Sequence, residues 1–178
     1  HPYDVIEDIG IMYGFDKIKE FPLTTFTRGS ATDISGFIGK IREIAVGLGY
    51  QEIMSAILTN KEVLYSKMNA EDFGTIEIED YMSETYSVVR SWLLPSLMEV
   101  FSKNKHVEFP QKIFEEGLVS SRKNEYVNEC SRIAVASSHE GANYTEMRQV
   151  LDYILKCLGL HYDIEEAEQC SFIEGRVV

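Results

Sequence analysis

The chain has 178 residues, of which 44% are hydrophobic and 26% are charged, a composition typical of a soluble globular protein and not of a disordered or fibrous one. Its 17 basic and 29 acidic residues give a net charge of −12. Binding to phosphate groups needs a basic face, so this charge argues against nucleic-acid binding by this chain alone and against binding to an anionic membrane. Three unclustered cysteines and the lack of any apolar run near 18 residues favour a cytoplasmic protein with free thiols and no membrane partner.

The first predicted helix is short and is followed by a break. Residues 5–13 place apolar side chains at helical spacing, and Gly14 ends the pattern. Proline, glycine and paired threonines then interrupt any periodicity over residues 21–30. The chain also opens without a methionine. We therefore expect a fragment, in which this helix is the tail of a preceding unit.

The second predicted helix covers residues 34–48 and carries a continuous apolar stripe. Thr32 or Asp33 can cap its start. Gly36 and Gly39 each lower its intrinsic stability by about 1 kcal/mol relative to alanine. Close packing against another element would be a reason for these two glycines.

The middle of the chain alternates short strands with helices. Residues 51–58 and 75–79 predict strands, and Asn60 can cap a short helix that continues to residue 68. Residues 91–104 predict another amphipathic helix, with Pro95 tolerated only in its first turn.

The last part of the chain predicts a hairpin, a long helix and two more strands. The hairpin strands are residues 112–120 and 132–137, around a polar turn at 122–125. The helix covers residues 144–158, and the final strands are 161–167 and 172–178. Helices and strands interleave, which indicates an α/β or an α+β fold, and the connection lengths leave both open.

Motifs of known enzymes are missing or out of context. Gly47 and Gly49 begin a dinucleotide-like pattern, but they lie between a helix and a strand, where a helix end is the simpler explanation. His139 and Glu140 lack the second histidine of a zinc protease. No nucleophile–base–acid set stands out. The sequence therefore predicts no catalytic and no cofactor-binding residue.

Three acidic residues are the candidate metal ligands. Asp4, Glu7 and Asp8 are spaced so that their carboxylates share one helix face, which suits a hard cation such as Mg²⁺. A solvated acidic helix start, favoured by the helix dipole, explains the same residues.

Two groups of basic residues also allow two interpretations each. Arg90 either anchors an anion or forms a structural ion pair with a carboxylate, and the ion pair is the more economical interpretation. Lys103, Lys105, His106 and Lys112 either contact phosphate or complement the end of the predicted helix over residues 91–104.

Six segments together resemble one family, the β subunit of phenylalanyl-tRNA synthetase in its archaeal and eukaryotic form. Two of them read DVIEDIGIMYGFDKI and YSVVRSWLLPSL, and all six occur in the family's order. The matching segments are residues 4–18, 47–52, 86–97, 104–117, 139–146 and 171–176.

The resemblance implies a fold and a division into domains. Residues 1–20 would end a helical, DNA-binding-like domain, and residues 21–178 would form a module truncated at its C-terminus. That module would be α+β, with the antiparallel sheet of class II aminoacyl-tRNA synthetases flanked by helices. It would be catalytically inert.

The residues aligned with the class II motifs support this inertness. Ser121 stands where the second motif of a catalytic subunit carries an ATP-binding arginine, although Arg122 is adjacent and a slip by one residue is possible. The proline of the first motif is missing from residues 50–58, and the third motif is not found before residue 178. A hydroxyl cannot replace a bidentate cation in stabilising charge on a transferring phosphoryl group.

The resemblance further implies partners and a function. The module would dock the α subunit, which binds ATP, in an (αβ)₂ phenylalanine–tRNA ligase that acts on tRNA(Phe). Asp4, Glu7 and Asp8 would contribute to a Mg²⁺ shared with α. The apolar stripe of residues 34–48 would lie at the intersubunit bundle or pack only on its own sheet. The alternatives are a stand-alone adenylate-forming ligase or amide synthetase, and a regulatory paralogue of a class II synthetase.

Overall fold

The computed structural model describes all residues from 1 to 178, which form two compact units, His1–Thr32 and Asp33–Val178. Helices and mostly antiparallel strands are mixed in the larger unit, so the predicted α+β class is confirmed. The contacts divide the chain at Thr32, whereas the predicted domain boundary follows residue 20. The assignment of residues 1–20 to a preceding domain stays a prediction.

The first unit consists of helix α1 (Pro2–Tyr13), the 3₁₀ helix η1 (Phe15–Lys17) and an extended segment. The side chain of His1 accepts a hydrogen bond from the backbone of Tyr3 and so caps the start of α1. Gly14 follows its last residue, as predicted. No residue of α1 is buried, so the apolar side chains of this helix have no core within the unit.

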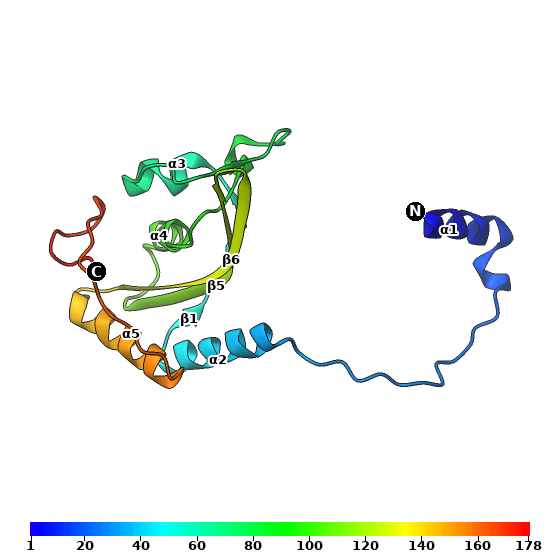
Figure 1. The fold of residues 1–178 in the computed structure, drawn as a ribbon, viewed down its shortest axis with the longest axis horizontal. Helices are drawn as coiled ribbons and strands as arrows, with labels where there is room; N and C mark the ends of the chain where they lie inside the picture. Colours follow the sequence, from blue (N-terminus) through cyan, green and yellow to red (C-terminus); the bar gives the residue numbers. More distant parts are fainter. The chain divides into compact units, whose positions relative to one another are not determined.

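A long hairpin forms the centre of the second unit (Figure 1). Strands β5 (Gln111–Lys123) and β6 (Tyr126–Ser138) pair antiparallel over their whole length, and the turn places Asn124 at a φ of +59°. Asparagine tolerates this left-handed conformation better than most residues. Strand β1 (Gln51–Glu52) pairs in parallel with β5, so the strand order is β1-β5-β6.

A second small sheet lies beside the hairpin, with β2 (Leu58–Thr59), β4 (Val88–Val89) and β3 (Ile76–Glu77) in the order β2-β4-β3, all antiparallel. Two backbone hydrogen bonds join its connecting segments to β5. The amide of Ser120 donates to the Arg90 carbonyl over 3.0 Å, and the amide of Arg122 donates to the Gly74 carbonyl over 2.7 Å. A side chain at Gly74 would collide with the backbone of Arg122, and its φ is +112°, so glycine is required there.

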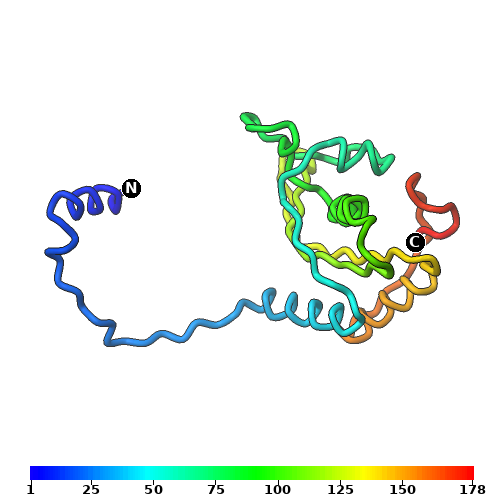
Figure 2. Tube along the Cα trace, turned by 180° about the vertical axis from the view of Figure 1, so that it is seen from behind, coloured from blue at the N-terminus to red at the C-terminus, as the bar shows by residue number.

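Helices cover both faces of the hairpin (Figures 1 and 2). Helices α2 (Asp33–Gly47) and α5 (Tyr144–Cys157) pack against one face, where Phe114 is buried with residues of both. Helix α4 (Leu94–Lys103) packs against the other, where Ile113 meets Leu97. Neighbouring residues of a strand point to opposite faces, so Ile113 belongs to one core and Phe114 to the other. The short helices are α3 (Lys61–Leu64), η2 (Ser66–Met68) and η3 (Glu84–Tyr86).

The helices of the sequence prediction are confirmed within a few residues, including Asn60 as the cap of α3 and Pro95 in the first turn of α4. The strands are less accurate. Residues 51–58 contain all of β1 and the first residue of β2, with an irregular segment between them, and β4 was missed. The strands predicted at 161–167 and 172–178 are wrong: one backbone hydrogen bond, from the Ala167 amide to the Val177 carbonyl, joins these segments, and no ladder forms.

The expected close packing of Gly36 and Gly39 is also not found within this chain, because nothing lies within 4 Å of a Cβ placed at either. By helical spacing both point away from the apolar stripe of α2. None of the helices is long and apolar enough to cross a membrane.

Candidate functional site

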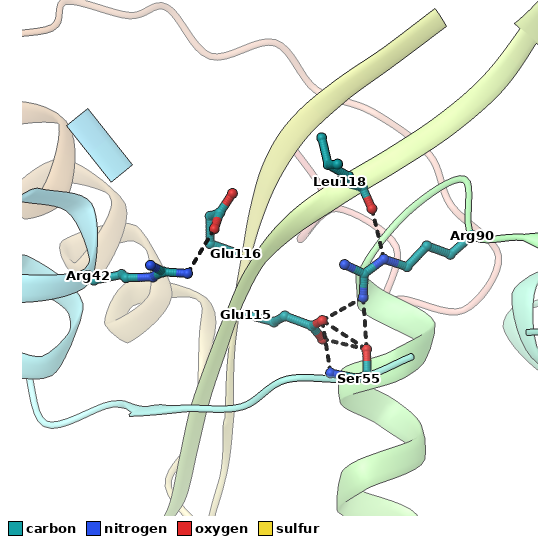
Figure 3. A network of polar contacts seen from close by, with 6 residues as sticks. All are labelled: Arg42, Ser55, Arg90, Glu115, Glu116 and Leu118. Atoms are coloured by element: carbon teal, nitrogen blue, oxygen red, sulfur yellow. Dashed lines mark hydrogen bonds and ion pairs between the residues drawn. The ribbon is translucent and has the colours of Figure 1, made fainter. Parts of the chain in front are cut away.

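Two consecutive glutamates on β5, Glu115 and Glu116, are the central residues of a network of ion pairs and hydrogen bonds (Figure 3). Because strand residues alternate, their carboxylates point to opposite faces of the sheet. Each meets an arginine from a different part of the chain: Arg90 follows β4, and Arg42 belongs to α2. We call these the inner pair, Arg90–Glu115, and the outer pair, Arg42–Glu116.

The inner pair is almost completely buried, with 3% of the Arg90 side chain and 1% of the Glu115 side chain exposed. The guanidinium Nη1 lies 2.5 Å from Glu115 Oε1 and 2.9 Å from Ser55 Oγ, and Nε donates to the Leu118 carbonyl over 2.9 Å. Ser55 donates its hydroxyl and its backbone amide to the same carboxylate. The predicted structural ion pair of Arg90 is therefore confirmed, and its partner is Glu115.

Gly117 leaves the space that the inner pair needs. It lies two residues after Glu115, on the same side of β5. A Cβ at this position would lie 2.1 Å from Nη2 of Arg90, well inside the contact distance of two atoms. The sequence Glu115-Glu116-Gly117 thus combines a buried anion, a second anion on the other face and a gap for the cation.

The outer pair is half-exposed. Arg42 Nη2 donates to Glu116 Oε2 over 3.1 Å, and Arg42 Nε lies 2.6 Å from Glu52 Oε1 on β1. The Arg42 side chain is 42% exposed and that of Glu116 is 12% exposed. The two pairs together connect α2, β1, the segment after β4 and β5.

A third carboxylate, Glu146 in the first turn of α5, holds the base of the hairpin. Its oxygens lie 2.8 Å from Lys112 Nζ and 2.7 Å from His139 Nε2. The hydrogen bond from Lys112 is the main cause that lowers the pKa of Glu146, and the bond to His139 adds to it, while burial acts in the opposite direction. Lys112 is thus an internal partner of α5.

Other sequence candidates lie apart from these pairs. Ser121 is near the tip of β5, partly exposed, and Arg122 beside it is exposed. Lys103 is at the end of α4 and forms an ion pair with Glu99, one helical turn earlier. This contact fits the interpretation that Lys103 complements its own helix.

The predicted metal ligands Asp4, Glu7 and Asp8 lie on α1, where all three are exposed. The α-amino group of His1 donates a hydrogen bond to Asp4 Oδ2 over 2.7 Å and forms an ion pair with it. Nowhere in residues 1–178 do three acidic, histidine or cysteine side chains converge as a metal centre would require. The chain by itself therefore contains no closed cation site at this helix.

Sequence reasoning missed Glu115, Ser55 and the outer pair. The sequence did contain a pattern that indicates a buried carboxylate. Two adjacent glutamates inside a predicted strand point to opposite faces, so one of them must point toward a covered face. A buried carboxylate needs a cation or several donors. The arginine that supplies it could not be read from the sequence, since 25 residues separate the two partners.

Comparison with known proteins identifies the family. Residues 19–178 match the model of the phenylalanyl tRNA synthetase beta chain CLM domain. The chain belongs to this family. It is 42% identical over 180 residues to the phenylalanine–tRNA ligase beta subunit of Thermococcus sibiricus and 43% identical over 179 residues to that of Methanococcoides burtonii. In both cases the alignment covers 99% of this chain and 32% of the relative, so the chain spans about a third of the length of these curated relatives.

A solved structure supports the fold independently. A pyrrolysyl tRNA synthetase from Desulfitobacterium hafniense superposes with a TM-score of 0.61, over 72% of this chain and 48% of that one. The sequences are only 13% identical, so the likeness concerns the fold alone. It confirms the predicted class II synthetase-like architecture of this member of the β-chain family.

Proposed function

We propose that this chain is part of the β subunit of a phenylalanine–tRNA ligase, which joins L-phenylalanine to tRNA(Phe) with ATP in the cytoplasm. Within an (αβ)₂ holoenzyme the module is a catalytically inert scaffold that docks the α subunit and supports its active site. The observation that carries this proposal is the match of residues 19–178 to the β-chain family, with relatives about 40% identical over nearly the whole chain.

The polar groups of the module support the scaffold role. The two charged side chains buried in the sheet, Arg90 and Glu115, form an ion pair with each other, and both have further hydrogen-bond partners within the chain. Ser121 has a hydroxyl where a catalytic subunit would use a cation. ATP in the holoenzyme is therefore assigned to the α subunit. Calorimetry of this chain with ATP should give no binding, and micromolar affinity would favour a stand-alone adenylate-forming enzyme instead.

The apolar stripe of α2 is the proposed docking element, but only part of this stripe is exposed. Ile41 and Ala45 in the second half of the helix are buried in the module's own core. Ile34 and Phe37 in the first half remain 57% and 40% exposed. Only this first half is left to contact the α subunit.

The docking proposal is tested with two matched variants mixed with the α subunit and analysed by size-exclusion chromatography. Phe37→Asp should weaken or abolish the complex, because a carboxylate would be buried there without a partner. Val46→Asp is the control, since Val46 is an exposed apolar residue of the same helix on the other side from Phe37. Equal complex formation by both variants and the wild type would contradict the docking assignment and leave the family membership unaffected.

We also propose that Asp4, Glu7 and Asp8 contribute to a Mg²⁺ that is completed by the α subunit. The three carboxylates share one exposed face of α1, which fits a contribution to a shared site and does not fit a site closed within this chain. Bound Mg²⁺ would supply electrostatic stabilisation of phosphate charge. Mn²⁺ binding, followed by electron paramagnetic resonance, should be tighter in the αβ complex than in this chain, and Glu7→Gln should reduce it in the complex only.

A further inference from the structure

The guanidinium of Arg90 is surrounded by acceptors from two separate segments of the chain, strand β5 and the segment between β1 and β2 (Figure 3). Glu115 provides a carboxylate, Ser55 a hydroxyl and Leu118 a backbone carbonyl, at 2.5, 2.9 and 2.9 Å from the nearest guanidinium nitrogen. Ser55 in turn donates to Glu115, so these two acceptors are also joined by hydrogen bonds that do not involve Arg90. The carbonyl of Leu118 is part of the backbone of β5, which pairs with β6 along its whole length.

The groups around Arg90 fit a planar guanidinium group better than the compact ammonium group of a lysine. Nε and Nη1 donate hydrogen bonds to acceptors that lie in two different directions, and Nη2 lies in the space that a side chain at Gly117 would fill. A lysine ammonium has a single nitrogen and cannot reach the carbonyl of Leu118 and the carboxylate of Glu115 with the same geometry. The backbone of Arg90 is fixed separately, because its amide donates to Ile57 and its carbonyl accepts from Ser120.

From these contacts we propose that Ser55, Glu115, Gly117 and the Leu118 carbonyl form a guanidinium-binding pocket, and that Arg90 is its built-in ligand. The pocket recognises the guanidinium group by shape and charge, and Arg90 closes it to external ligands. Its second effect is mechanical, because the occupied pocket joins the segment after β4 to β5 and to the segment between β1 and β2. The proposal concerns this chain alone and does not depend on the proposed function.

Chemical rescue tests the pocket. In Arg90→Ala the acceptors remain and the cation is removed, so the melting temperature should fall by roughly 10 °C. Methylguanidinium, at millimolar concentrations too low to denature, should raise the melting temperature of Arg90→Ala by several degrees and leave the wild type unchanged. Methylammonium at the same concentration is the control and should have no such effect. Equal stabilisation by both cations, or no stabilisation by either, would overturn the proposal.

A second experiment uses milder variants, in case Arg90→Ala does not fold. Gly117→Ala should strongly destabilise the wild type, because its Cβ would lie 2.1 Å from Nη2 of Arg90. In the Arg90→Lys background there is no Nη2, so the same Gly117→Ala change should cost much less. An equal loss of melting temperature in both backgrounds would show that Gly117 is needed for another reason and that the guanidinium does not define the pocket.

Discussion

The inner and outer pairs come from adjacent residues of one strand and use the same two chemical groups, yet they differ in almost every physical respect. Glu115 and Arg90 are nearly inaccessible to water, and the contact between Arg90 Nη1 and Glu115 Oε1 is 2.5 Å long. Glu116 faces Arg42, whose side chain is 42% exposed and is shared with Glu52. Burial strengthens an ion pair and at the same time makes the loss of one partner costly. The comparison teaches that neighbouring, chemically identical residues can carry very different weight in a fold.

The largest effect is expected from Glu115→Ala. This change leaves the buried guanidinium of Arg90 without its anion, so the free energy of unfolding should fall by about 3–5 kcal/mol. Urea denaturation followed by circular dichroism measures the difference. A cost below about 1 kcal/mol would mean that water reaches Arg90 in solution and would remove the distinction between the two pairs.

A double variant sharpens this test. Replacing both members, as Arg90→Met with Glu115→Leu, removes both charges from the interior and should restore most of the lost stability, because apolar residues of similar size often replace a buried pair at little cost. A double variant as unstable as Glu115→Ala would show that the packing or the hydrogen bonds of Ser55 and Leu118 matter more than the charges.

A smaller effect is expected from Glu116→Ala, the matched change on the neighbouring residue. The outer pair is partly solvated, so its loss should cost at most about 1 kcal/mol, measured by the same urea titration. Added salt should reduce this difference, because partly exposed charges are screened. A cost equal to that of Glu115→Ala would contradict the argument from burial.

The smallest effect, and one that depends on pH, is expected from Glu146→Gln. The pKa of Glu146 is lowered mainly by Lys112, so its carboxylate stabilises the folded state at a pH above its ordinary pKa of 4.5, and this contribution is lost as the pH falls through the lowered folded-state pKa. Glu146→Gln should therefore be less stable than the wild type at pH 7, by a few tenths of a kcal/mol, and equally stable in strong acid. Thermal melts across pH 2–7 measure it, and a constant difference would refute the ion-pair explanation.

Local patterns in the sequence predicted the helices well. The apolar stripes of α2, α4 and α5, the cap at Asn60 and the glycine after α1 are short-range features, and each was found where it was expected. The strands were harder to predict because a strand exists only with a partner. Residues 161–167 and 172–178 have suitable side chains but no ladder, whereas β4 is only two residues long and owes its existence to β2 and β3.

The candidate site shows the same division. The sequence indicated that Arg90 forms an ion pair and that the glycines of α2 need an explanation. It could not supply the partner of Arg90, nor show that Gly36 and Gly39 face open space while Gly117 is the glycine with a packing role. The resemblance, with its family and class II fold, came from order-preserving motifs and is confirmed; the metal ligands remain a prediction.

The sequence by itself determined the helices, the α+β character and the family, because these depend on residues close together in the chain or on motifs preserved in order. Only the tertiary structure decided which of two adjacent glutamates is buried, which arginine neutralises it and where a missing Cβ makes room for a guanidinium. The physical reason is that the dielectric environment and the packing around a charge are set by segments tens of residues apart, which meet only when the chain is folded.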